Sequence, residues 1–458
     1  MEDLYLAASE FTYWIQDEMA RLRIPGLALG VLFGEQTYRA AYGVTSVENP
    51  LPVSADTLFQ VGSISKTFTA LAVMRLVERG ELALDRPLIE DLPELRLADL
   101  QVQRRVTLRH IFTHTGGWLG DYFDDTGRGD DALAKIVARL GDLPQQTPLG
   151  EIWSYNNAGF YLAGRVIEVK TGKTYEAALQ ELVLDPLEMH HSFYDPADVM
   201  THRFVVGHSA VFPGQAGEPA VQRPWALARA GSPVGGLAAS LNDMLRYARF
   251  QLGDGCIPGS QARLLSSTLL QEMQRPCAPA AHGEQFGVSW FIRALEDLQV
   301  LRHGGATHGQ MATFQFVPGR DLAVVVLTNS DRGDELYTPL AAHLVERLLH
   351  KDYPKPQVIE HPEHLAGFAG RYTAAADDYT LDWRDGELWL LHQPRGGFPA
   401  KDSPPSAAHP PVRVALCAPD CWMVVDEPGQ GDLGEILRDP QGRIAWLRFG
   451  GRVHRRID

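Results

Sequence analysis

The sequence predicts a large mixed α/β domain followed by a smaller all-β domain. With 458 residues, the chain exceeds the size of one ordinary domain. Strand-like runs lie at both ends of the first 350 residues with helical patterns between them, so one sheet is expected to form from distant segments. A Pro-rich stretch at 351–363 then precedes short runs of aromatic and β-branched residues. We expect domains at 1–350 and 364–458, joined by a linker at 351–363.

The larger domain is expected to begin with a helix and a hairpin. Apolar residues recur at helical spacing over 3–22 and stop before Ile24-Pro25-Gly26. Two strands are expected at 27–33 and 37–44. The run 66–77 is apolar on nearly every side, which is typical of a buried helix, and Gly80 ends it. Further helices are expected at 132–140, 158–171, 174–183, 240–252 and 336–349, and strands near 287–292, 312–317 and 322–328.

The smaller domain is predicted to be a β-barrel or sandwich. Its strand-like runs are broken by the turn sequences Arg384-Asp385-Gly386 and Asp439-Pro440-Gln441-Gly442. The segment 394–411 is rich in Gly, Pro, Ser and Ala and is expected to be a loop.

Charge and the N-terminus exclude several classes of partner. The chain carries 42 basic and 57 acidic residues, a formal charge of −15, and no basic cluster, which argues against binding to nucleic acid or anionic lipid. Glu2, Asp3 and Glu10 stand where a signal peptide would be basic and apolar. The most apolar later run, residues 322–328, is too short to cross a bilayer. We expect no membrane and no nucleic-acid partner.

The cysteine content fits a reducing compartment, because four cysteines are too few for a disulfide framework. A cytoplasmic location is therefore expected. Cys417 and Cys421 have the C-x3-C spacing of a chelate, but no second pair or His cluster completes a tetrahedral metal site. Neither a metal nor a cofactor is expected.

The first motif with chemical content is an S-x-x-K at the start of the predicted buried helix. Its spacing of three places Ser63 and Lys66 on one helix face. Serine needs a nearby base, and a lysine serves as one only when burial and the helix N-terminus lower its pKa. The alternative is a capping Ser followed by a solvated Lys. Gly62 and the apolar helix after Lys66 weigh against that alternative.

The second motif is Trp153-Ser154-Tyr155-Asn156-Asn157, a Y-x-N ahead of a predicted helix. A tyrosine hydroxyl beside a lysine can move a proton, and an asparagine amide can hold both a lysine and a substrate carbonyl. The alternative is an aromatic turn in which Asn157 caps the helix.

The third motif is Arg302-His303-Gly304-Gly305-Ala306. Glycines on a strand allow the backbone of a substrate to approach, and the amides of Ala306 and Ser63 could together form an oxyanion hole. His303 could equally be a polar loop residue.

The order of the three motifs resembles that of the serine β-lactamase, penicillin-binding protein and class C-like esterase superfamily. The resemblance covers about residues 8–345, and the stretches 84–87, 107–117 and 326–329 agree with it. It implies an antiparallel sheet flanked by helices, with a helical subdomain. Two histidines of the second stretch, His110 and His114, are interpreted as structural.

The resemblance also implies a role for each motif residue. Ser63 would be the acylated nucleophile and Lys66 its base. Tyr155 would relay the proton to the leaving group, while Asn157 would orient Lys66 and the substrate.

The third motif departs from the K-T-G typical of the superfamily. His303 takes the place of the lysine, so a fixed cation is replaced by a group expected to titrate near neutral pH. Gly304, Gly305 and Ala306 would contact the substrate, with the Ala306 amide holding the oxyanion. The H-x-G form is similar to that of esterases, D-amino-acid peptidases and amidases, which puts efficient β-lactamase action in doubt.

The smaller domain resembles the lipocalin-like β domain that some members of the superfamily append. The segments 365–372 and 446–455 resemble its first and last strands.

These observations leave three hypotheses for function. The first is a hydrolase of small peptides, amides or esters, D-amino-acid-containing ones included, with an acyl-enzyme on Ser63. The second is a penicillin-binding-protein-type thioesterase that cyclises peptides. The third is a binding protein that keeps the cleft without turnover. Whether the chain forms a homo-oligomer is left open.

Overall fold

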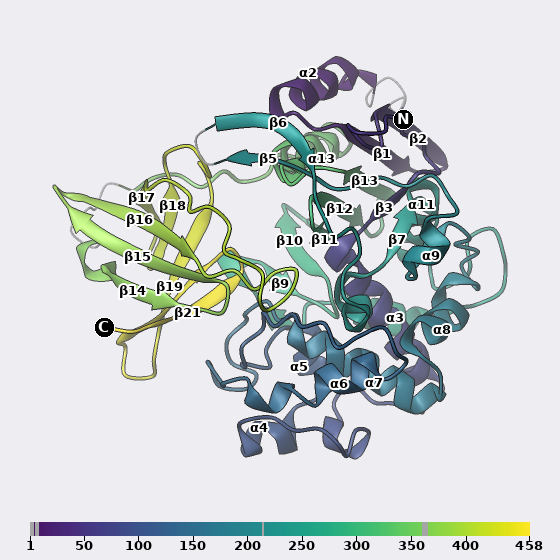
Figure 1. Cartoon of the computed structure of the whole chain (residues 1–458), viewed down its shortest axis with the longest axis horizontal. Helices are drawn as coiled ribbons and strands as arrows, with labels where there is room; N and C mark the ends of the chain where they lie inside the picture. Colours follow the sequence, from purple (N-terminus) through teal and green to yellow (C-terminus); the bar gives the residue numbers. More distant parts are fainter. Residues whose placement is uncertain (1–3, 5–8, 213–214, 360–364) are drawn as a thin grey trace.

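A computed structural model describes residue 4 and residues 9–212, 215–359 and 365–458. Its larger part is built on one antiparallel sheet in which both ends of the domain's sequence meet, because β1 pairs with β13 through Leu27 and Thr328 (Figure 1). The strand order is β2-β1-β13-β12-β11-β10-β9-β8. The strands are β1 (Gly26–Phe33), β2 (Gln36–Gly43), β8 (Ala278–Pro279), β9 (Gln285–Phe286), β10 (Phe291–Leu295), β11 (Leu298–Thr307), β12 (Gln310–Val317) and β13 (Leu322–Thr328). The predicted sheet from distant segments is confirmed.

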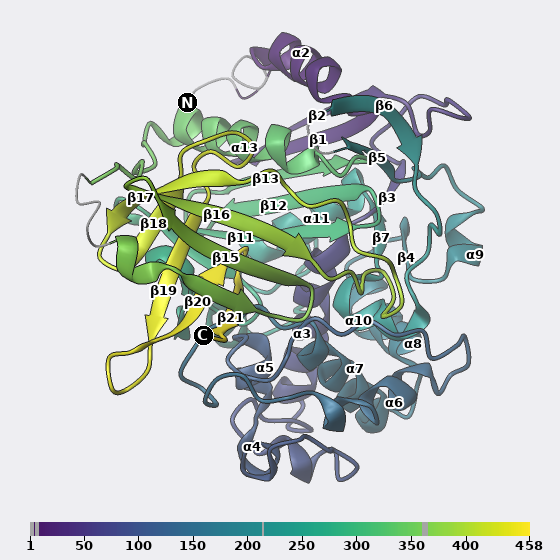
Figure 2. The ribbon, with the colours of Figure 1, turned by 60° about the vertical axis from the view of Figure 1, so that its left-hand side comes forward.

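Helices cover both faces of this sheet (Figure 2). On one face, α2 (Thr12–Leu22) and α13 (Gly333–Leu349) pack with β1 and β13 in an apolar cluster, in which Ile15, Leu22 and Leu340 have no solvent exposure. On the other face, α11 (Leu241–Leu252) packs against β1 and β13. The buried helix α3 (Ser65–Glu78) lies in the second and larger core with α7 (Ala158–Thr171) and with the π-turn that follows α8 (Tyr175–Leu179).

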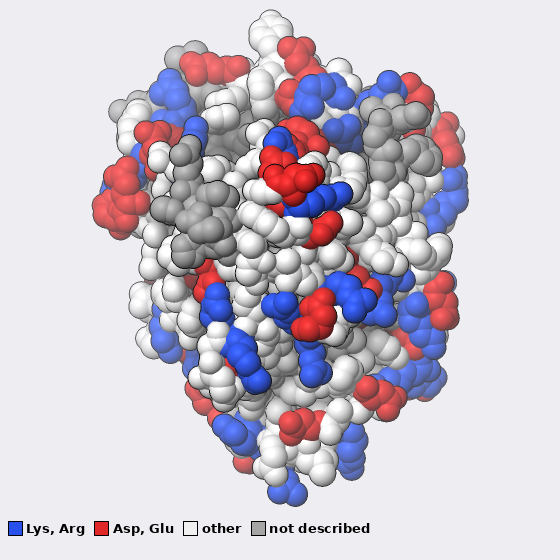
Figure 3. Space-filling view, turned by 90° about the vertical axis from the view of Figure 1, so that its left-hand side faces the viewer, with Lys and Arg blue, Asp and Glu red and all other residues white. Residues whose placement is uncertain are grey.

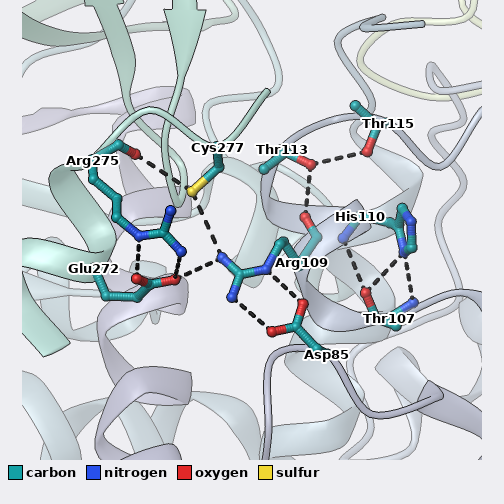
Figure 4. Close-up of polar contacts among 9 residues, drawn as sticks. All are labelled: Asp85, Thr107, Arg109, His110, Thr113, Thr115, Glu272, Arg275 and Cys277. Carbon is teal, nitrogen blue, oxygen red and sulfur yellow. Dashed lines mark hydrogen bonds and ion pairs between the residues drawn. The ribbon is translucent and has the colours of Figure 1, made fainter. Parts of the chain in front are cut away.

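A helical part lies below the sheet in Figure 1. Arg109 on α5 fixes this part, because its guanidinium pairs with Asp85 in the preceding loop and with Glu272 on α12 (Figure 4). The two accessory stretches at 84–87 and 107–117 therefore meet in the fold. The remaining α-helices described in the larger domain are α4 (Leu100–Arg105), α5 (Leu108–Phe112), α6 (Ala132–Val137), α9 (Pro196–Val199), α10 (Ser232–Gly235) and α12 (Ser267–Gln274).

Two small sheets complete the larger domain. One has the order β3-β7-β4 and lies at the entry to the S-x-x-K turn. The other is a two-stranded ribbon of β5 and β6. Their bounds are β3 (Leu58–Gln60), β4 (Ser192–Phe193), β5 (His208–Phe212), β6 (Gln215–Val221) and β7 (Ala238–Ser240).

The smaller domain is a closed eight-stranded antiparallel barrel, which confirms the predicted all-β domain. The predicted turn at Asp385-Gly386 joins β15 to β16, and both residues have a positive φ, as a two-residue hairpin turn requires. The segment 395–411 contains no helix or strand, as predicted. The strands are β14 (Gly370–Thr373), β15 (Asp377–Arg384), β16 (Glu387–Pro394), β17 (Val412–Ala418), β18 (Cys421–Val424), β19 (Leu433–Arg438), β20 (Ile444–Phe449) and β21 (Arg452–Arg456).

The strand predicted near 287–292 is displaced, because only its last two residues lie in β10. Residues 287–290 form the turn between β9 and β10, in which Gly287 N donates to Trp290 O at 2.8 Å. Val288 and Trp290 are fully buried. Their apolar character therefore reflects packing of the turn against the core, which periodicity alone does not distinguish from a strand.

Most other predicted elements occur within a few residues of their expected bounds. The helix predicted at 3–22 is described from Thr12, and most of its earlier residues lie outside the described range. The helix predicted at 174–183 ends at Leu179 and continues as a wider π-turn at 180–184. In the linker, 351–359 has no regular structure and 360–363 lies outside the described residues.

Basic and acidic side chains are mixed over the face drawn in Figure 3. None of the helices described is both long and apolar enough to cross a membrane.

Cys417 Sγ and Cys421 Sγ lie 3.4 Å apart as free thiols. In the described part of the chain, no three His, Cys, Asp or Glu side chains are grouped to hold a metal ion. The cytoplasmic location stays a prediction.

Candidate active site

Ser63 lies on a tight turn that packs directly against β11. The turn is a single 3₁₀ segment, Gly62–Ile64, that leads into α3. Gly62 has φ 54°, and a Cβ there would lie 2.5 Å from Ala306 N. A Cβ at Gly305 would overlap Val61 O. Glycine is therefore required on both sides of this contact, which brings the backbone of β11 against that of Ser63.

Lys66 is fully buried and contacts Ser63. Its Nζ is hydrogen-bonded to Ser63 Oγ at 3.0 Å and donates to Val234 O at 2.7 Å. Burial, followed by the charge of Arg452, holds the pKa of Lys66 well below its ordinary range, and Asp121 opposes this shift. A larger fraction of Lys66 is therefore neutral near pH 7 than of an exposed lysine, and neutral amine can accept the proton of Ser63.

The Y-x-N segment uses its two asparagines differently. Asn156 Oδ1 accepts from Gly159 N at 2.8 Å and so satisfies a free amide at the start of α7. Asn157 holds the N-cap position but makes no side-chain capping bond. Its Nδ2 donates to Asp121 Oδ1 at 2.7 Å. The capping alternative thus applies to Asn156, while the Asn157 amide faces Asp121 rather than the expected partner Lys66.

Tyr155 lies beside Lys66 and Ser63. The centre of its ring is 5.0 Å from Lys66 Nζ, and the residue is 7% exposed. Its hydroxyl lies near Ser63 without a hydrogen bond of good geometry. Burial raises the pKa of Tyr155, and the Ser63 hydroxyl opposes this. Tyr155 is therefore a neutral phenol at pH 7, able to donate a proton.

His303 does not match the expectation of a group titrating near neutral pH. It lies in β11 opposite Phe314 and is 1% exposed. Burial, and secondarily the charge of Lys66, lower its pKa to about 3, so the ring is neutral at pH 7. Nδ1 lies 2.6 Å from Gly304 O and must carry the proton, because a carbonyl only accepts. Nε2 is then a buried acceptor without a protein partner.

The two histidines interpreted as structural hold backbone rather than approach Ser63. His114 Nδ1 accepts from Asn156 N at 3.0 Å, and its ring packs 4.3 Å from that of Tyr155. His110 closes a capping box with Thr107 at the start of α5. These contacts support the structural interpretation.

Two charged residues of the site, Arg452 and Asp121, were not found from the sequence. Arg452, on β21 of the barrel, donates Nε to Asp121 Oδ2 at 3.0 Å, and its guanidinium lies 4.7 Å from the centre of the Tyr155 ring. Burial alone would raise the pKa of Asp121, but Arg452 and Asn157 together lower it below its ordinary value. No local motif surrounds either residue, so no sequence signal could have found them.

Comparison with known proteins gives concordant results. The family described as Beta-lactamase matches residues 11–347. Penicillin-binding protein 4 of Amycolatopsis lactamdurans is 32% identical over 76% of this chain and 93% of its own length. Esterase EstB of Burkholderia gladioli is 37% identical over 41% of this chain and 50% of its own. Among solved structures, SurE with D-Leu has a TM-score of 0.74 at 24% identity and covers 99% of this chain and 100% of its own.

Proposed function

Since the chain belongs to the β-lactamase family, we propose that it is a serine hydrolase that forms an acyl-enzyme on Ser63 and acts on small peptides, amides or esters. One observation carries this proposal: a fully buried lysine, with a lowered pKa, lies 3.0 Å from a serine hydroxyl. Relatives that include a penicillin-binding protein and an esterase support the same chemistry.

In the proposed acylation, Ser63 Oγ attacks the substrate carbonyl and passes its proton to Lys66 Nζ. The amides of Ser63 and Ala306 stabilise the oxyanion. Tyr155 then donates a proton to the leaving group and is reprotonated from Lys66. Water attacks the acyl-enzyme in the second half of the reaction, and the same groups act in reverse.

The neutral state of His303 bears on the substrate. A neutral ring offers an acceptor at Nε2 instead of the fixed cation that would grip a carboxylate. Uncharged esters and amides are therefore the first donors to test. The likeness to SurE, solved with D-Leu, adds donors that end in a D-amino acid.

A second candidate is transfer of the acyl group to an amine, as in the cyclisation of a peptide thioester. The SurE structure that this chain resembles over both domains was solved with D-Leu, whose amine is of the kind that could accept an acyl group. Both candidates share the acyl-enzyme on Ser63 and differ only in the acceptor.

The test is intact mass spectrometry after brief exposure to a p-nitrophenyl ester or a fluorophosphonate. A covalent adduct is expected on the wild type and not on Ser63→Ala. A panel of D-Leu and D-Ala amides, esters and thioesters, with and without an added amine, then separates hydrolysis from amine transfer. Folded wild-type protein that forms no adduct with either probe would overturn the proposal and leave a binding protein without turnover.

A further inference from the structure

The turn between β20 and β21 of the barrel is hydrogen-bonded to the Y-x-N segment. Tyr155 N donates to Gly451 O at 2.9 Å, and Val453 N donates to Ser154 Oγ at 3.1 Å. On β20, Arg448 Nη1 donates to Trp153 O at 3.0 Å. Three consecutive residues of the segment thus have partners in the barrel. By contrast, the contacts of Lys66 with Ser63 and Val234 lie within the larger domain.

Arg452 lies at the centre of this contact. It donates two hydrogen bonds to Asp121, from Nε and Nη2, and a third from Nη1 to Gly450 O. Asp121 in turn accepts from Asn157, and the guanidinium stacks on the Tyr155 ring. The Arg452 side chain is 37% exposed and that of Asp121 12%, so the pair lies at the edge of the site.

We propose that Arg452 is a positioning residue of the active site supplied by the barrel, which with Asp121 fixes Tyr155 and Asn157 and sets a charge pair beside Lys66. The inference rests on the proposed function, because it assigns Lys66 the role of base. It makes the barrel part of the active site, acting on the larger domain's nucleophile through Tyr155 and Asp121.

The other groups around Lys66 are uncharged at pH 7, so the charges that act on it are those of Arg452 and Asp121. Tyr155 is a neutral phenol, and the pKa of His303 and that of His114 are lowered by burial, so both rings are neutral at pH 7. Phe160, 5.4 Å from Nζ, carries no charge. Arg452 lowers the pKa of Lys66 and Asp121 raises it. Removing either member alone therefore changes the pH at which Lys66 becomes neutral, and the two changes have opposite signs.

The test is the pH dependence of kcat/KM for an activated ester in Arg452→Gln, Asp121→Asn and the double variant. On the acid side, kcat/KM rises with pH as Lys66 loses its proton. Arg452→Gln removes a positive charge that lowers the pKa of Lys66, so this rise is expected to move to higher pH. Asp121→Asn removes a negative charge and is expected to move it to lower pH. The double variant should lie near the wild type.

Loss of positioning is measured separately in the same variants. Arg452→Gln is expected to lower kcat about 10-fold, because the Tyr155 ring loses the guanidinium that packs on it. Arg452→Lys keeps the charge, so its pH profile should match the wild type even where kcat falls. Arg413→Gln, which breaks ion pairs within the barrel with Asp426 and Glu387, is the control and should change neither quantity.

The outcomes distinguish this inference from the proposed function. If the wild type forms no acyl-enzyme, the proposed function fails. If it does and both single variants keep the wild-type pH profile while their melting temperatures show them folded, the role of Arg452 fails alone. A fall in kcat without opposite shifts would show a structural contact only. Should Arg452→Gln not fold, Arg452→Lys and Asp121→Asn still give the comparison.

Discussion

Ser63 lies on the 3₁₀ turn that leads into the buried helix α3, and Lys66 lies three residues later in the first turn of that helix. Tyr155, by contrast, lies on a segment that is hydrogen-bonded to barrel residues up to 299 residues further along the chain. The first pair is oriented by helix geometry and by the close packing of β11. The position of Tyr155 depends on the docking of the barrel, through several hydrogen bonds and through ion pairs that include Arg452–Asp121 and Lys401–Asp124.

This difference indicates which half of the site tolerates change. A buried helix in a large core is hard to displace, because any movement leaves cavities or overlaps. Hydrogen bonds between domains contribute about 1 kcal/mol each, so the Tyr155 side can be weakened in steps. Variants on the Ser63 side should act on chemistry, and variants at the barrel should act on alignment.

The largest effect is expected from Lys66→Met. Loss of the base should lower kcat by at least about 10³-fold. The cost in stability should stay within about 2 kcal/mol, because a buried amine is removed while Val234 O loses its donor. Ester turnover and denaturant unfolding measure both. Lys135→Met, at a half-exposed lysine on α6, is the control. Turnover within 10-fold of the wild type would break the assignment of chemistry to this side.

Gly305→Ala tests the close contact between β11 and the Ser63 turn. The added methyl group would overlap Val61 O, so the backbone must shift. We expect kcat to fall about 10²-fold through a misplaced oxyanion hole. At Gly304 the nearest atom to an added Cβ is 3.7 Å away, so Gly304→Ala should cost much less stability. Equal melting temperatures for the two variants would show that the contact is not tight.

His303→Gln tests whether His303 contributes an ionisation to the pH profile of the reaction. Because burial lowers the pKa of His303 to about 3, the ring is uncharged throughout pH 5–8 and does not set the acid side of the profile. The variant is expected to lose about 10-fold in kcat/KM with the loss of the Nε2 acceptor, while the pH of half-maximal activity stays unchanged. An ionisation near pH 6.5 that disappears in His303→Gln would contradict this.

The smallest effect is expected from Trp446→Phe at the barrel contact. The indole N–H donates to Gln146 O at 3.2 Å, and its loss should cost about 1 kcal/mol and leave kcat within about two-fold. Thermal unfolding measures the cost. Trp389→Phe, on β16 beneath Arg384, provides the same substitution away from the contact. A large loss of activity in Trp446→Phe alone would mean that even one interdomain hydrogen bond aligns Tyr155.

Where pattern and packing agreed, the fold could be predicted from local sequence. Helix α7 has the bounds that its periodicity predicts, and the Asp385-Gly386 turn joins two strands as its residue types require. The failure at 287–290 has the opposite origin. There a turn is buried by its neighbours, and burial is a property of the assembled core that apolar residues do not reveal.

For the site, the sequence by itself determined which residues to consider, because Ser63 with Lys66, Tyr155 with Asn157, and His303 with Ala306 each lie within a few positions of one another. Only the tertiary structure decided the neutral state of His303 and the pairing of Asn157 with Asp121. It alone brought Arg452 to Tyr155. Spacing along the chain fixes which side chains share a helix face or strand, whereas desolvation and contacts between distant segments arise only when the two domains pack together.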